Sequence, residues 1–164
     1  MRRRLETVLA CLLAGSCTSP ATSLAEDLCH AGETTYFSCR TAPGKTLSLC
    51  GSVPSALQYR YGRAPKVELA FPPDANDGLR QLGYAHYTRY QAERTEVGFS
   101  HADVDYAVFD YTEDGQRTAG VRVTTADGNG HEVACAGAIR GRLDTLGTSL
   151  RCDPDNALNG GACR

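Results

Sequence analysis

Short runs in which apolar and polar residues alternate dominate the chain between residues 34 and 135. In residues 56–61, Leu57, Tyr59 and Tyr61 share one face, and Gln58 and Arg60 share the other. A period of two is typical of a strand with one buried face. Similar runs, separated by glycine, proline and polar turns, occupy residues 34–39, 46–50, 67–71, 84–91, 95–101, 104–111, 120–125 and 131–135.

These runs predict an all-β fold, because they are joined by short connections and do not alternate with helical segments. We expect an antiparallel sandwich or small barrel of about eight strands. Only residues 138–150 place apolar side chains at roughly helical spacing, and three glycines weaken that pattern. The chain therefore has at most one short C-terminal helix.

The first two runs flank the turn signal Ala42-Pro43-Gly44-Lys45, which predicts a β-hairpin. A two-residue loop at Pro43-Gly44 places Cys39 opposite Ser48. A four-residue loop, residues 43–46, places Cys39 directly opposite Cys50, within disulfide reach. We favour the second arrangement.

Residues 1–25 have the features of a signal peptide, and residues 26–164 are predicted to form one exported all-β domain. Three consecutive arginines precede a short apolar run, and small residues stand at Ser23 and Ala25. The alternative is a lipoprotein signal that ends at Cys17, because residues 13–17 are close to a bacterial lipobox. Either reading predicts a periplasmic or extracellular protein with no transmembrane segment in the mature chain.

Export agrees with the cysteines. Of eight in the chain, six remain beyond residue 25, spaced too widely for a zinc knuckle, and an even number in an exported domain predicts a disulfide framework. We expect one bridge across the first hairpin, a second that closes the segment of residues 137–150 at its base, and a third that joins the two ends of the mature chain. The predicted pairs are Cys39–Cys50, Cys135–Cys152 and Cys29–Cys163.

The net charge does not indicate a nucleic-acid partner, and the motifs do not indicate a catalytic site or a cofactor. Without residues 1–25 the chain has 14 basic and 18 acidic side chains, a formal net charge of −4. His131-Glu132 lacks the second histidine of a zincin motif. His101, Asp103 and Asp105 could present metal ligands at alternate positions, but a polar turn is the favoured reading. No cofactor and no metal are predicted.

Tyrosine and arginine gather on the middle strands, with Arg63 and Arg94 close by in the sequence. These side chains bury area while donating hydrogen bonds, so they are typical of recognition surfaces. The alternative is a strand whose tyrosines face the core and whose arginines form ion pairs outside. The predicted binding residues are Arg60, Tyr84, His86, Tyr87, Arg89 and Tyr90.

The pieces YFSC–GK–LSLCGS (residues 36–52), LQYRYG (57–62), VELAFP (67–72) and YAHYTRYQAERTEVGFS–DYAVFDY resemble small exported proteins of Gram-negative bacteria with no assigned activity. The resemblance implies a periplasmic or surface location and provides no catalytic residue. In size, disulfides and β pattern, the chain is also similar to periplasmic lysozyme-inhibitor barrels, a likeness of architecture only.

The sequence therefore favours a non-enzymatic exported binding module, for example an inhibitor. Its expected partner is an envelope protein or an anionic or sugar-like ligand. The alternative is a hydrolase or metal-dependent enzyme that uses His86 or His101 with Asp103 and Asp105. That alternative requires these side chains to converge in one pocket.

Overall fold

A computed structural model describes residues 27–161 and 163, and the predicted signal peptide and lipidation at Cys17 lie outside these residues. One sheet of ten strands, in the order β10-β5-β6-β7-β8-β9-β1-β2-β3-β4, contains all the expected runs and confirms the all-β class. The strands are β1 Thr34–Thr41, β2 Thr46–Ser52, β3 Ala56–Arg63, β4 Lys66–Phe71, β5 Gly83–Arg89, β6 Ala92–His101, β7 Val104–Glu113, β8 Gln116–Thr125, β9 Gly130–Gly141 and β10 Arg151–Cys152.

Helical structure is limited to short turns in the described residues. They are η1 Ala75–Asp77, α1 Gly78–Gln81, η2 Leu143–Leu146 and η3 Ala157–Asn159. The first begins after the Asp74 side chain accepts a hydrogen bond from the backbone N–H of Asn76, a typical N-cap. Residues 138–141 remain in strand β9, so the C-terminal segment contains 3₁₀ turns and no α-helix.

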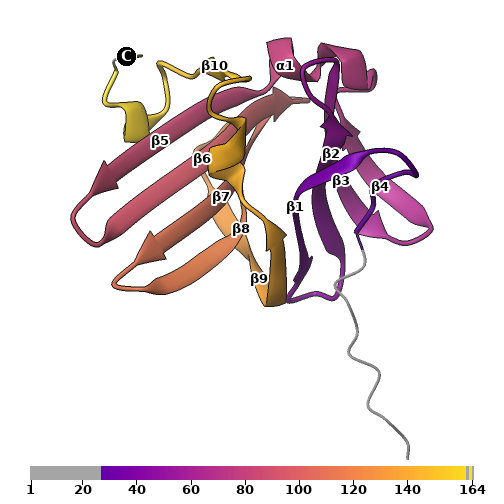
Figure 1. Cartoon of the computed structure of the whole chain (residues 1–164), viewed down its shortest axis with the longest axis horizontal. Coiled ribbons are helices and arrows are strands. Elements are labelled where there is room, and N and C mark those ends of the chain that lie inside the picture. The colour runs from indigo at the N-terminus through magenta and orange to yellow at the C-terminus, as the bar shows by residue number, and fades with distance from the viewer. Residues whose placement is uncertain (1–26, 162, 164) are drawn as a thin grey trace, which may run out of the picture.

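Strand β9 joins two halves of the sheet, β1–β4 and β5–β8 (Figure 1). Its first residues pair with β8, with Ala134 opposite Gly120, and its last residues pair with β1, with Ile139 opposite Cys39. The change of partner falls between Ala134 and Cys135, because Cys135 already lies opposite Thr41 of β1. Gly137 follows in the irregular stretch of the β1–β9 pairing with a φ of 95°, a conformation that glycine adopts without strain. The strand therefore links the two halves, and the sheet curls into a half-barrel.

The core fills the inner face of the curled sheet. The Phe99 ring of the second half lies 4.4 Å from Phe71 and 5.0 Å from Tyr59 of the first half, measured between ring centroids. The turn η2 lies between the halves, and its Leu143 and Leu146 are fully buried (Figure 1). Burial of these side chains from both halves stabilises the curled shape of the open sheet.

All six cysteines beyond residue 25 form disulfides, as predicted, but each predicted pairing is wrong. The bonds are Cys29–Cys50, Cys39–Cys135 and Cys152–Cys163.

The register of the first hairpin explains the error at Cys39. The backbone N–H of Thr41 donates to the carbonyl of Lys45, which leaves a loop of Ala42, Pro43 and Gly44. Cys39 is then opposite Leu47 rather than Cys50. The difference of three residues is odd, and an odd shift in register exchanges the two faces of a strand. Cys39 therefore faces the core and Cys135, whereas Cys50 faces outward.

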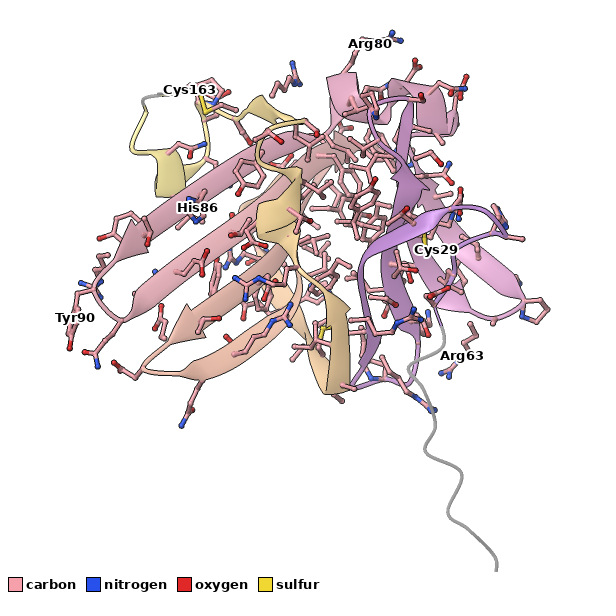
Figure 2. The ribbon with its side chains drawn as sticks, in the orientation of Figure 1. Cys29, Arg63, Arg80, His86, Tyr90 and Cys163 are labelled. Atoms are coloured by element: carbon pink, nitrogen blue, oxygen red, sulfur yellow. A yellow bond between two sulfur atoms is a disulfide. The ribbon has the colours of Figure 1, made fainter. Side chains whose placement is uncertain are left out.

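The other two pairings fail because of where the chain ends lie. Cys29 lies against the outer face of the first half, and Cys163 lies beyond the second half, next to β5 (Figure 2). Cys163 instead closes a short loop with Cys152, which lies in β10 opposite Tyr84 of β5. Cys135 is needed at the junction of β9 with β1.

Candidate functional site

The six predicted binding residues do not form one surface. Tyr84 and His86 lie half-buried on the inner side of β5, with ring centroids 6.3 Å apart. Tyr87 is 41% exposed and Tyr90 is 88% exposed, at the end of the β5–β6 hairpin, where Arg89 is also exposed (Figure 2). These three exposed residues stay a predicted contact surface.

Arg60 is the clear correction, because its side chain is buried and fully paired. It lies on the outer face of the first half and is 3% exposed, covered by residues 27–33. Its Nε donates to Gln58 Oε1 at 2.8 Å, and its Nη1 donates to the Leu28 carbonyl at 3.0 Å. Both terminal nitrogens donate to the Glu33 carboxylate, at 2.5 and 2.8 Å. Arg60 therefore holds the N-terminal segment on the sheet and offers nothing to a ligand.

This ion pair predicts a dependence of stability on acid. Hydrogen bonds from Arg60 hold the pKa of Glu33 below its ordinary value of 4.5. A lowered pKa in the folded state stabilises the protein above the unfolded-state pKa, and that stabilisation is lost as pH falls through the folded-state pKa. We expect Glu33→Gln to flatten the decrease of melting temperature below pH 4.5.

Thermal melts at stepped pH values measure this effect. Asp114→Asn is the matched control, because Asp114 is an exposed residue of the β7–β8 turn and not part of the Arg60 ion pair. An acid dependence as steep in Glu33→Gln as in the parent protein contradicts the prediction.

The residues of the predicted enzyme alternative do not converge. His86 is opposite Thr95 on β6, whereas His101 ends the same strand, six residues and roughly 20 Å farther along. The His101 ring packs on Phe71 at the inner face, at 5.6 Å between centroids. Asp105 lies on the outer face, where it accepts a hydrogen bond from Ser100 at 2.5 Å. His101 and Asp105 are therefore on opposite sides of the sheet.

One cluster among the described residues has the composition of a metal site. Ligand atoms of Cys29, Glu33 and Cys50 lie within 4.8 Å of one another. The two sulfur atoms are bonded to each other and cannot act as thiolate ligands. The carboxylate already accepts hydrogen bonds from Arg60. This cluster is therefore a structural crosslink.

A groove of about 880 Å³ lies on the outer face of β6, β7 and β8, and we call it the outer groove. The C-terminal segment forms one wall, and strand side chains form the floor and the other wall. Its lining includes Arg94, Glu96, Gly98, Tyr111, Arg122, Thr124 and residues 151–158.

Small residues leave the space that becomes the outer groove. Gly83, Gly98 and Ala107 lie side by side across β5, β6 and β7, on the outer face. A Cβ atom at Gly83 would lie 3.0 Å from Cβ of Asp153, so a larger residue there would push the C-terminal wall away. Because these residues are small, there is room on the outer face for both the C-terminal wall and the groove beneath it.

Specific hydrogen bonds fix the C-terminal wall to the sheet. The backbone N–H of Asp153 donates to the Tyr84 carbonyl at 2.9 Å, continuing the short β10–β5 pairing. Asn159 accepts from the His86 backbone N–H at 3.2 Å and donates to the Tyr84 carbonyl at 3.1 Å. The Cys152–Cys163 disulfide closes this segment on itself. The wall is therefore a defined part of the fold.

A buried charge network forms the centre of the groove floor. Glu96 is 4% exposed and accepts hydrogen bonds from the Tyr111 hydroxyl, from Arg122 Nη1 at 3.1 Å and from Asn156 Nδ2 at 2.7 Å. Burial, together with the bond to Glu96, raises the pKa of Tyr111 to about 12. Burial opposes the charge of Arg122, but Tyr111 and Glu96 outweigh it and raise the pKa of Arg122. The phenol therefore stays neutral and the Arg122 guanidinium stays charged at neutral pH.

Arg94 and Tyr111 border one end of the outer groove. The Arg94 guanidinium lies over the Tyr111 ring, 5.4 Å from its centroid, and Nε of Arg94 pairs with Glu113. A guanidinium has five N–H donors, so this ion pair leaves several free to contact a ligand. The aromatic face and the cation together provide a contact surface.

The groove as a whole is close to electrically balanced. Its arginines, Arg94, Arg122 and Arg151, are accompanied by four carboxylates, Glu96, Asp105, Asp153 and Asp155. Such a lining has donors and acceptors in similar numbers and no strong excess of either charge.

Sequence reasoning identified Arg94 only as a neighbour of the predicted surface and did not identify the groove. The available signal was a set of polar and aromatic residues on the outer face of three adjacent strands, namely Arg94, Glu96, Tyr111 and Arg122. They lie beside Gly83 and Gly98, which are opposite each other on β5 and β6. The C-terminal wall had no such signal, because its contacts join residues 60 to 75 positions apart.

Three disulfides are typical of proteins from oxidising compartments. In residues 27–161 and 163, none of the helices has the length and apolar character needed to cross a membrane. The chain matches no family model, no curated protein and no solved structure.

Proposed function

We propose that this protein is a non-enzymatic exported binding protein, periplasmic or extracellular, whose outer groove takes a neutral, hydroxyl-rich ligand such as a saccharide. The observation that carries the proposal is the groove itself, which is preformed around the Glu96–Tyr111–Arg122 network. Its volume of about 880 Å³ falls within the range of known ligand sites.

The chemistry of the lining favours a sugar over a strongly charged ligand. Each sugar hydroxyl both donates and accepts, so it can bond to the N–H groups of Arg94 and to the acceptor oxygens of Asp105 and Thr124 alike. An anionic ligand favours an excess of cations, which the balanced lining lacks. The part of the Tyr111 side chain that lines the groove offers apolar surface against which the C–H face of a sugar can pack.

The rigidity of the groove also supports binding. Among the described residues, every buried side-chain nitrogen and oxygen atom has a hydrogen-bond partner. The polar groups of the floor are held in place before a ligand arrives, which reduces the entropy lost on binding. The signal-peptide pattern of residues 1–25 and the disulfides support the exported location.

Calorimetric titration of the purified, oxidised protein with chito-, cello- and malto-oligosaccharides tests the proposal. Thr124 lines the outer groove, so Thr124→Trp fills it with a bulky ring and is expected to weaken binding by about tenfold or more, the equivalent of one or two lost hydrogen bonds.

Thr88→Trp is the matched control. Thr88 is an exposed threonine on β5 whose side chain alternates to the opposite face from Tyr87. The control is expected to bind as tightly as the parent protein. Failure of every oligosaccharide to bind, or equal binding by Thr124→Trp and the parent, contradicts the proposed function.

A further inference from the structure

We infer that the outer groove is one part of a longer track, and that the ligand is a linear oligosaccharide chain rather than a single sugar. This inference rests on the proposed function. It comes from a second hollow of about 420 Å³ on the same face, nearer the ends of the hairpins, which we call the tip hollow. Its lining is Arg94, Tyr111, Glu113, Asp114, Gln116 and Thr118.

The two hollows are adjacent because they share a wall. Arg94 and Tyr111 line both of them, and these two residues are direct cross-strand partners on β6 and β7. The guanidinium lies over the ring, so the shared wall is a cation–aromatic pair that a ligand can cross. A chain seated in the outer groove can therefore continue into the tip hollow.

The register of the strands places both hollows along one line of the outer face. Tyr87, Arg94, Tyr111 and Thr118 form a single cross-strand row over β5 to β8. The outer groove extends from this row along β6 to Ser100, six residues or roughly 20 Å away. The tip hollow lies on the other side of the row, toward the turn at Asp114. This length suits a chain of several sugar units.

The tip hollow has the same kinds of hydrogen-bonding groups as the outer groove, and a backbone hydrogen bond holds the turn at its end in place. Glu113 and Asp114 provide acceptors, Gln116 provides both a donor and acceptors, and Arg94 provides donors. The backbone N–H of Asp114 donates to the Gln91 carbonyl at 2.9 Å, which ties the β7–β8 turn to the β5–β6 turn. Exposed Tyr87, next to Arg94 in the row, adds a ring face beside the track.

Chain length is the variable that tests the track. Dissociation constants of the purified, oxidised protein are measured for the disaccharide and the hexasaccharide of the chito, cello and malto series. In the series that binds, we expect the hexasaccharide to bind about tenfold more tightly than the disaccharide, because the tip hollow adds hydrogen bonds.

Thr118→Trp separates the track from the groove. Thr118 is exposed and lines only the tip hollow of the two, so a bulky ring there blocks the extension and leaves the groove open. The variant is expected to lose the tenfold advantage of the hexasaccharide and to keep the affinity of the parent for the disaccharide. Thr88→Trp is again expected to change neither value.

Three outcomes overturn the inference. If the two lengths bind equally, or if Thr118→Trp keeps the full advantage of the hexasaccharide, the outer groove is the whole site and the proposed function stands. If no oligosaccharide of either length binds, both the proposed function and the track are wrong.

Discussion

Replacement of Arg60 by alanine is expected to lower the free energy of unfolding by about 3–5 kcal/mol, the usual cost of removing one partner from a buried ion pair. The Arg60 side chain is 3% exposed and donates to Gln58, to the Leu28 carbonyl and twice to Glu33. Its loss removes both Arg60 hydrogen bonds from the partly buried Glu33 carboxylate and leaves the Leu28 carbonyl without this donor. It also weakens the attachment of residues 27–33 to the sheet, which the Cys29–Cys50 disulfide still maintains.

Urea-induced unfolding followed by circular dichroism measures this change. Arg89→Ala is the control, because Arg89 is an exposed arginine of the same predicted binding surface, and exposed substitutions usually change stability by less than about 0.5 kcal/mol. If Arg60→Ala is as stable as Arg89→Ala, the buried clamp does not have the role described above.

Removal of the Cys39–Cys135 disulfide is expected to be the other large loss of stability. The bond joins residues 96 positions apart, so it restricts the unfolded chain strongly, and its removal by the double alanine variant should cost roughly 4–5 kcal/mol. It also crosslinks β1 to β9 at the junction of the two halves, and Cys39 is fully buried. The loss should therefore act on the whole fold.

The Cys152–Cys163 pair provides the comparison. It spans 11 positions, so the double alanine variant of this pair should cost less, about 3 kcal/mol at most. Unfolding curves of the two variants, alongside peptide mapping under non-reducing conditions, measure both the energies and the pairings. A larger cost for the C-terminal pair, or a peptide that joins Cys39 to Cys50, contradicts the structure.

Features that depend on neighbouring residues could be predicted from the sequence. The run at 104–111 became β7, and the turn signal at Asp127-Gly128 joins β8 to β9 in the expected hairpin, with Thr124 opposite Gly130. Alternation, turn residues and the even cysteine count are local or compositional properties. They determine that the protein is a disulfide-stapled β structure, whatever its strands pair with.

Hairpin register was the first feature that the sequence left open. The turn at Pro43-Gly44 fits loops of several lengths, and each length selects a different partner for Cys39. Only the packing of Phe37, Cys39 and Leu49 into a common core selects one of them. The disulfide pairing followed from that choice, because Cys50 turned outward to Cys29.

Coverage of the outer face was decided by the tertiary structure as well. Alternation places Arg60 and Glu96 on the side of their strands away from the core, where charged residues are usually exposed to solvent. Residues 27–33 cover the first of these side chains, and residues 151–158 form a wall over the second. A strand's sequence determines the direction of its side chains, but the segments that cover them come from distant parts of the chain. For this reason the buried clamp and the outer groove were found only in the folded structure.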